Sequence, residues 1–252
     1  YYLEEEDGFE PDIDKLNELA TDKTKAIVLN FPNNPTGRIL KKDKLKAICE
    51  IAKDRDAWIL ADEVYRGIEF EGPFSPSFAE YYDKAIVTSS LSKVWGLPGL
   101  RIGWMIAPKD FVERGSAFKE YTTLGSSLLS EHLATIALER GMRERLIERG
   151  RRLVKDSFKI FEEWVDTHND IFSWIKPSFG VIALVKHGLK MTSKEFSDRV
   201  FEKRVAIVPC DIAFTRLQRY LRICYCLPPE PLRQALSKVD EAIDSIRVKT
   251  AA

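Results

Sequence analysis

The sequence predicts an α/β fold, with a largely parallel sheet that carries helices on both faces and a smaller C-terminal α+β domain. First, short apolar segments alternate with amphipathic helical segments through the first half of the 252 residues. Such strands are typical of parallel sheets buried on both faces. Second, a long helical pattern near residues 127–170 leads into shorter strands and helices. We therefore expect a large domain at residues 1–139, and a linking helix with a small domain at residues 140–252.

The first predicted strand lies at residues 25–30 and the first amphipathic helix at residues 41–55. The strand is a short, β-branched apolar run that ends in the turn-forming sequence FPNNPTG. The apolar residues of the helix recur at i, i+3, i+4 and i+7 and share one face. They are Leu45, Ile48, Cys49 and Ala52. A second buried strand at residues 58–61 ends at Asp62.

Two more strands are expected at residues 85–88 and 102–107, on either side of the sequence SSLSKVWGLPGLR. The long helix that follows has an apolar stripe at i, i+4, i+7 and i+11. Its members are Val154, Phe158, Phe161 and Val165. The rest of the chain alternates short strands with helices, which is the pattern of an α+β domain. The strands are expected at 181–185, 206–208 and 221–224.

Composition excludes several classes of function. Lys plus Arg and Asp plus Glu both total 39, so the chain lacks the positive charge of a nucleic-acid binder. The four cysteines lack CxxC spacing and the three histidines are scattered, so neither a metal site nor a disulfide framework is indicated. No apolar run approaches the roughly 20 residues that span a bilayer. We expect a cytoplasmic protein with small-molecule partners and no membrane contact.

Polar residues that follow parallel strands are the first candidates for a functional site, because ligands bind beyond the carboxyl ends of such strands. Lys93 follows one predicted strand, with Ser90 and Ser92 before it and Arg101 eight residues after it. A lysine amine can hold an aldehyde covalently while hydroxyl groups and a guanidinium bind a phosphate. Without further context, this motif would be interpreted as a solvated lysine in a loop rich in Ser and Gly.

Two companion motifs also follow predicted strands. NNPTG occupies residues 33–37, and DEVY occupies residues 62–65. In isolation the first would be an ordinary turn and the second a helix N-cap. Their common position after strands makes them candidates for the same site.

A third companion is Arg222, in the predicted strand YLRIC. Its side chain faces away from those of Leu221 and Ile223, because successive strand residues point to opposite faces. A strand arginine on its own is more often a surface residue. Arg216 and Arg219 lie nearby and are alternatives for the same role.

Together these motifs resemble those of fold-type I, pyridoxal phosphate-dependent aminotransferases of class I/II, the family that includes aspartate aminotransferase. The resemblance covers essentially all 252 residues. The family's N-terminal phosphate loop and ring-stacking aromatic residue would precede Tyr1, so we expect a partial large domain that lacks its N-terminal part. The resemblance implies pyridoxal 5'-phosphate as cofactor and no metal.

The resemblance also implies a role for each site residue. Lys93 forms a Schiff base with the cofactor, and Asp62 keeps its pyridine nitrogen protonated. Asn34 and Tyr65 hydrogen-bond its phenolic oxygen, and Arg222 binds the substrate α-carboxylate. The expected catalytic residues are Lys93, Asp62 and Tyr65; the cofactor-binding residues are Asn34, Asp62, Tyr65, Ser90, Ser92, Lys93 and Arg101; the substrate-binding residues are Arg222 and Asn34.

The function implied by the resemblance is transfer of an amino group between an L-amino acid and a 2-oxo acid. The family also implies a homodimer, in which residues 121–128 reach toward the partner's cofactor. It further implies a cis peptide bond between Asn34 and Pro35. No retained residue indicates which amino acid or 2-oxo acid is used.

Two alternatives remain open from the sequence. The same motifs serve other pyridoxal phosphate reactions on this fold, such as those of a lyase, a cyclase or a synthase, because fold and cofactor do not determine the reaction. The second alternative is that the chain is an inactive fragment or a ligand-sensing aminotransferase-like module.

Overall fold

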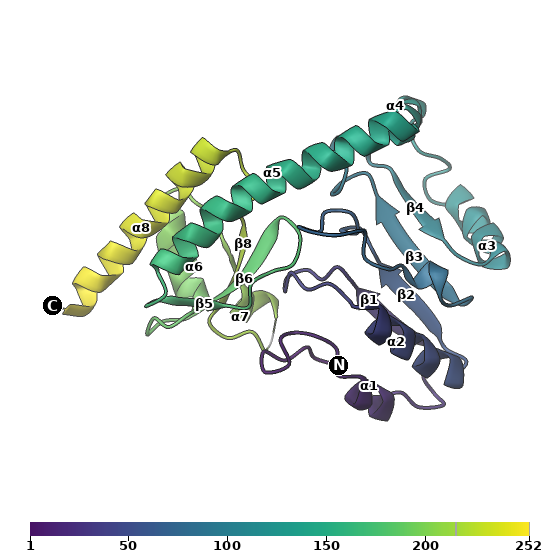
Figure 1. Ribbon diagram of the computed structural model, residues 1–252, viewed down its shortest axis with the longest axis horizontal. Coiled ribbons are helices and arrows are strands. Elements are labelled where there is room, and N and C mark those ends of the chain that lie inside the picture. The colour runs from purple at the N-terminus through teal and green to yellow at the C-terminus, as the bar shows by residue number, and fades with distance from the viewer. Residues whose placement is uncertain (215, 252) are drawn as a thin grey trace. The chain divides into compact units, whose positions relative to one another are not determined.

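The chain forms two compact units in a computed structural model that describes residues 1–214 and 216–251 (Figure 1). The first unit comprises residues 1–34 and 38–151, and the second comprises residues 35–37 and 152–252. Helix α5 (Arg140–Thr167) begins in the first unit and ends in the second. No helix in the described ranges combines the length and apolar character that a membrane crossing requires.

The first unit is built on a four-stranded sheet in the order β1-β2-β3-β4. The strands are β1 (Ala26–Asn30), β2 (Trp58–Asp62), β3 (Ala85–Ser90) and β4 (Gly103–Ile106). The first three are parallel, and β4 runs antiparallel to β3. The sheet is therefore mostly parallel. Its register pairs Asn30 with Asp62 and Asp62 with Thr88, so the carboxyl ends of the three parallel strands meet at one edge.

One face of this sheet is buried by helices α1 (Ile13–Leu19) and α2 (Lys42–Asp54). Because strand side chains alternate between faces, every second strand residue enters this core. Those buried there include Ile27, Ile59, Ala61, Ala85 and Val87, packed with α2 residues such as Leu45 and Ile48.

The opposite face is less completely covered. Helix α3 (Lys109–Glu120) contacts it through Phe111, whose ring centroid lies 5.5 Å from that of Trp58. Val28, on the same face, is 70% exposed. Helices on both faces were expected; in the described part of the chain, one face is buried and the other is open at β1. Apolar strands indicate burial, but they do not say which element provides it.

Three short elements connect the strands and helices of this unit. They are the 3₁₀ turns η1 (Phe78–Glu80) and η2 (Pro98–Leu100), and helix α4 (Leu128–Leu138). The turn η2 ends at Arg101, whose backbone is left-handed with φ 55°.

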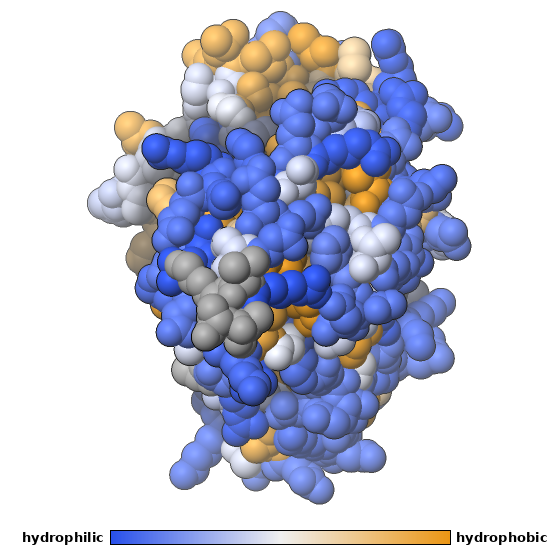
Figure 2. Space-filling model, turned by 90° about the vertical axis from the view of Figure 1, so that its left-hand side faces the viewer, coloured by the Kyte–Doolittle hydropathy of each residue, from blue (hydrophilic) through white to orange (hydrophobic). Residues whose placement is uncertain are grey.

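The second unit has an antiparallel sheet in the order β5-β6-β8-β7. The strands are β5 (Phe172–Trp174), β6 (Ile182–His187), β7 (Val208–Pro209) and β8 (Tyr220–Cys224). The helices after α5 are α6 (Ser193–Glu202), α7 (Cys210–Ala213) and α8 (Pro229–Ala251). Figure 2 shows a mostly hydrophilic face of the molecule on which apolar residues gather in separate patches.

Aromatic packing holds the second unit together. The ring of Phe161 from α5 stacks on Tyr225, with centroids 5.1 Å apart, and Phe158 also contacts Tyr225 at 5.6 Å. The buried Tyr225 hydroxyl donates to the carbonyl oxygen of Gly180 at 2.7 Å. These rings are core residues of the α+β unit.

Candidate active site

The loop that follows β1 is held by Asn30, the last residue of the strand. The Asn30 amide nitrogen donates to the backbone oxygen of Asp62 at 3.2 Å, and its side-chain oxygen accepts from the backbone N–H of Asn34 at 2.9 Å. Asn30 therefore joins two strand ends and orients Asn34. It was not among the predicted site residues, although its position at the end of a strand was a usable signal.

Asn34 and Tyr65 come together at this edge of the sheet. The Asn34 amide nitrogen lies 3.4 Å from the Tyr65 hydroxyl oxygen, which is long for a hydrogen bond. The Asn34 side-chain oxygen is buried with no hydrogen-bond partner in the described structure. The Asn34 amide group and the Tyr65 hydroxyl therefore lie side by side, and both are groups that can serve as hydrogen-bond donors.

Lys93 lies directly beyond β3, with its Nζ 5.7 Å from the centroid of the Tyr65 ring. Its side chain is exposed, whereas Leu91 and Val94 on either side are buried. The Leu97 N–H donates to the Leu91 carbonyl at 3.0 Å and closes the loop. Buried neighbours therefore anchor the loop while the amine remains accessible.

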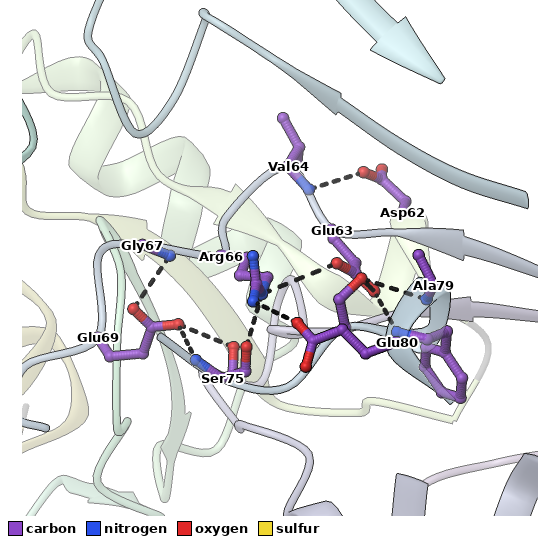
Figure 3. A network of polar contacts seen from close by, with 11 residues as sticks. Asp62, Glu63, Val64, Arg66, Gly67, Glu69, Ser75, Ala79 and Glu80 are labelled. Carbon is purple, nitrogen blue, oxygen red and sulfur yellow. Dashed lines mark hydrogen bonds and ion pairs between the residues drawn. The ribbon is translucent and has the colours of Figure 1, made fainter. Parts of the chain in front are cut away.

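The two acidic residues at the end of β2, Asp62 and Glu63, differ in exposure and in hydrogen bonding. Asp62 is exposed, and its carboxylate accepts a hydrogen bond from the Val64 N–H at 3.1 Å. Glu63 is buried and accepts from the Ser77 hydroxyl at 3.0 Å and the Phe78 N–H at 2.9 Å (Figure 3). Burial raises the pKa of Glu63, and these hydrogen bonds oppose the rise. Asp62 thus faces the open edge, while Glu63 holds a loop.

The predicted phosphate-binding residues lie at the end of the β3–β4 pair. The Ser90 hydroxyl oxygen accepts from the Ser92 N–H at 3.2 Å. The Leu91 N–H donates to the Ile102 carbonyl at 3.1 Å, which extends the pairing and brings the backbone of Arg101 beside this segment. The Arg101 guanidinium donates to the Pro98 carbonyl at 2.9 Å. The three residues therefore share a backbone region, but no hydrogen bond in the described structure joins Arg101 to either serine.

Arg222 lies in the second unit, on strand β8, where it pairs with Leu184 of β6 and Val208 of β7. Its neighbours Leu221 and Ile223 are buried, whereas Arg222 is half-buried. Strand alternation separates the arginine from the apolar core, as the sequence pattern indicates. Its role in substrate binding stays a prediction.

The turn after β1 contributes Gly37 to the second unit. Gly37 has φ +70°, and a Cβ placed on it would lie 2.3 Å from the Cβ of Pro177. Its carbonyl accepts from the Ser178 N–H at 2.8 Å. Only glycine fits this position, because both the backbone angle and the close contact exclude a side chain.

The predicted cis bond between Asn34 and Pro35 is wrong. The cis peptide bond in this loop joins Phe31 and Pro32 instead. Every bond before a proline has a small preference for trans, so the motif alone does not select between two prolines of one loop.

The residues at this edge fit pyridoxal phosphate. An accessible amine at Lys93 suits an aldehyde, and the converging donors of Asn34 and Tyr65 suit a phenolic oxygen. The Asp62 carboxylate, on the neighbouring strand, has the charge that holds a proton on a pyridine nitrogen. No group of three or more His, Cys, Asp or Glu residues in the described ranges is arranged to hold a metal ion.

Known proteins of similar sequence and structure cover nearly the whole chain. A relative from Thermococcus litoralis, an aromatic-amino-acid aminotransferase, is 29% identical over 245 residues, which are 95% of this chain and 62% of the relative. A capreomycidine synthase from Streptomyces vinaceus is 26% identical over 241 residues, covering 96% of this chain and 61% of the relative. The crystal structure of a PLP-dependent aminotransferase from Streptococcus suis matches 97% of this chain and 64% of that chain, with a TM-score of 0.90 and 32% identity.

The chain therefore spans less than two thirds of the length of the relatives named above. The family model described as "Aminotransferase class I and II" matches residues 1–239, which is nearly the whole chain. The chain belongs to the class I and II aminotransferase family.

Proposed function

We propose that this chain carries the catalytic lysine of a pyridoxal phosphate-dependent aminotransferase, which transfers an amino group between an L-amino acid and a 2-oxo acid. The observation that carries the proposal is the placement of the Lys93 amine beside Tyr65, whose hydroxyl faces the Asn34 amide. An isolated surface lysine would have no reason to lie beside a buried tyrosine that contacts this amide. Family membership supports the same assignment.

Pyridoxal phosphate, when bound, supplies an aldehyde that joins an amine and a ring that accepts electrons from the substrate α-carbon. Asp62 would hold a proton at the ring nitrogen, because its carboxylate accepts from Val64 and keeps further lone pairs available. Asn34 and Tyr65 would both donate to the phenolic oxygen. Ser90, Ser92 and Arg101 would bind the phosphate, once the Arg101 guanidinium turns away from the Pro98 carbonyl.

Lys93 would have a second role as general base and acid. Its Nζ would take the proton from the substrate α-carbon. It would later donate a proton to the carbon atom that joins the transferred nitrogen to the cofactor ring. Proton transfer by a positioned side chain typically contributes about 10²- to 10⁴-fold to the rate. In the second unit, Arg222 would bind the substrate carboxylate through two parallel hydrogen bonds.

The direct test is reduction with borohydride in the presence of pyridoxal phosphate, followed by peptide mapping. We expect a pyridoxyl adduct on Lys93 and none in Lys93→Ala. Lys109→Ala is the matched control, because Lys109 is also exposed and lies outside the site. An adduct on another lysine of the wild-type chain would refute the assignment.

A second candidate is a different pyridoxal phosphate reaction on the same site. The capreomycidine synthase relative supports this second candidate, because it shows that not every relative is named an aminotransferase. Incubation with an amino acid and 2-oxoglutarate separates the two. Transamination converts 2-oxoglutarate to glutamate, whereas elimination, cyclisation or condensation leaves 2-oxoglutarate unchanged.

We also infer a homodimer from an exposed apolar surface of the first unit. Between residues 118 and 138, the end of α3 and the start of α4 expose large apolar side chains, including Tyr121 at 88% and Leu128 at 83%. Large apolar side chains exposed together in one short segment are typical of interaction sites. Sedimentation of the wild type against Leu128→Glu tests it: the proposal requires a dimer that the charge weakens, and a monomeric wild type would contradict it.

A further inference from the structure

The residue after Lys93 is packed between two glycines that are distant in sequence. A Cβ placed on Gly150 would lie 2.9 Å from the carbonyl oxygen of Val94, and one placed on Gly67 would lie 2.9 Å from Val94 Cγ1. Val94 is 1% exposed. Glycine thus allows α5 to approach the Val94 backbone at Gly150, and allows the segment after β2 to approach the Val94 side chain at Gly67.

Arg151 connects these two glycines. It adjoins Gly150 in helix α5, and its Nε donates to the Gly67 carbonyl at 2.9 Å. One terminal nitrogen of its guanidinium donates to Glu69 at 3.2 Å. Glu69 in turn accepts from the Gly67 N–H at 3.0 Å. Both backbone polar groups of Gly67 are therefore held, one by an arginine and one by a carboxylate.

Both oxygen atoms of the Glu69 carboxylate accept hydrogen bonds. It is 2% exposed, and its second oxygen accepts from the backbone N–H of Ser75 at 2.9 Å and from the Ser75 hydroxyl at 2.8 Å (Figure 3). The Arg151 guanidinium also lies 5.0 Å from the centroid of the Phe74 ring. A carboxylate with four donors around it has one orientation, so the turn from Gly67 to Ser75 is fixed against α5.

We propose that Gly67, Glu69, Gly150 and Arg151 form a clamp that sets the position of the Lys93 amine. We call these four residues the Val94 clamp. The clamp holds the backbone one residue after Lys93 and two residues after Tyr65, which are the two groups that meet at 5.7 Å. The four are positioning residues, and the inference rests on the proposed function because it depends on the role of Lys93.

The expected effect follows from geometry. A methyl group on Gly150 would require the Val94 carbonyl to move by several tenths of an ångström to reach ordinary contact. A displacement of about 1 Å away from the reacting atoms can cost about 100-fold in rate, so we expect roughly a tenfold loss for Gly150→Ala. The readouts are the rate at which the Lys93-bound cofactor absorption grows after pyridoxal phosphate is added, and kcat with KM.

Gly141→Ala is the matched control. Gly141 lies in the same helix, and a Cβ there would meet no atom within 4 Å. Alanine favours a helix more than glycine does, so the control gains helix stability without disturbing Val94. We expect it to form the adduct at the wild-type rate, and Gly150→Ala to lower kcat with KM less affected.

A second pair of variants tests the arginine. Arg151→Lys keeps the charge but removes the planar guanidinium that reaches Gly67 and Glu69 together. Arg152→Ala is the control, because Arg152 is the exposed residue next to Arg151. Amide hydrogen exchange in the cofactor-free chain provides a readout that is independent of activity. We expect faster exchange across residues 91–97 in Gly150→Ala and Arg151→Lys, and no change in either control.

The outcomes separate the two proposals. A wild-type chain that forms no adduct at Lys93 overturns the proposed function, and the inference with it. An adduct that forms at one rate in the wild type and all four variants overturns the inference alone. Faster exchange with an unchanged adduct rate would reduce the clamp to a purely structural feature, which also overturns it.

Discussion

The side-chain amide of Asn34 lies 3.4 Å from the hydroxyl of Tyr65, although 31 positions separate the two residues. Each follows a parallel strand of the first sheet, and the in-register pairing of β1 with β2 brings the strand ends together. The contact is long for a hydrogen bond, and it places two groups of donor character next to each other at this edge of the sheet.

Tyr65→Phe should therefore raise the pKa of the Lys93-bound cofactor. A donor to a negatively charged oxygen stabilises the deprotonated form, and removing it reverses that effect. Visible absorption recorded across pH measures the change directly. Tyr81→Phe, at a partly buried tyrosine that lies beside Lys42 and outside the site, should leave the titration unchanged. If Tyr65→Phe titrates like the wild type, Tyr65 does not contact the phenolic oxygen.

Glu63→Gln should remove part of the pH dependence of stability. Burial raises the pKa of Glu63 above its ordinary value of 4.5 in the folded state, so the folded chain holds this proton more tightly than the unfolded chain. The contribution of this group is greatest at low pH and falls as pH rises from 4.5 through the folded pKa. Glutamine keeps an oxygen that can accept from Ser77 and Phe78 but does not ionise.

The measurement is urea unfolding of both proteins between about pH 4 and 7, a range chosen to bracket an ordinary carboxyl pKa. The stability of Glu63→Gln relative to the wild type should increase with pH across this window. A constant difference between the two curves would show that Glu63 does not couple to folding in this way.

Gly37→Ala should destabilise the second unit. A non-glycine residue at this left-handed angle costs about 1–3 kcal/mol, and the added Cβ would also meet Pro177 at 2.3 Å. Gly72→Ala separates the two causes, because Gly72 has φ +76° with no atom within 4 Å of its added Cβ. Denaturant unfolding should give a larger loss for Gly37→Ala than for Gly72→Ala. Equal losses would mean that the Pro177 contact relaxes without cost.

Arg222→Ala should weaken the binding of both the amino acid and the 2-oxo acid. Hydrogen bonds to charged groups are worth about 1.5–3 kcal/mol, which corresponds to roughly a 10- to 100-fold increase in KM. Steady-state kinetics with each substrate provide the comparison. Arg216→Ala should leave KM nearly unchanged. If KM rises in Arg216→Ala and not in Arg222→Ala, the carboxylate site has been assigned to the wrong arginine.

Much of the site was predictable because it depends on local patterns. The apolar runs at β1, β2 and β3 marked strands, and the first polar residues after them marked the edge that parallel pairing would bring together. The strand-end positions of Asn34, Asp62, Tyr65 and Lys93 could be predicted in this way, whereas their roles came from the family resemblance and stay predictions. The split between exposed Asp62 and buried Glu63 was not, because it depends on Ser77 and Phe78, which fold back over 14 and 15 positions.

The sequence by itself determined the strands, the helices and the polar motifs at strand ends, since each is set by side-chain periodicity or by neighbours within a few residues. Only the tertiary structure decided which proline bond is cis, that Val28 remains exposed, and that Gly150 and Arg151 of α5 meet Val94 and Gly67. The contacts of Gly150 with Val94 and of Arg151 with Gly67 join segments 56 and 84 positions apart, and loop closure over such distances leaves no local periodicity to detect.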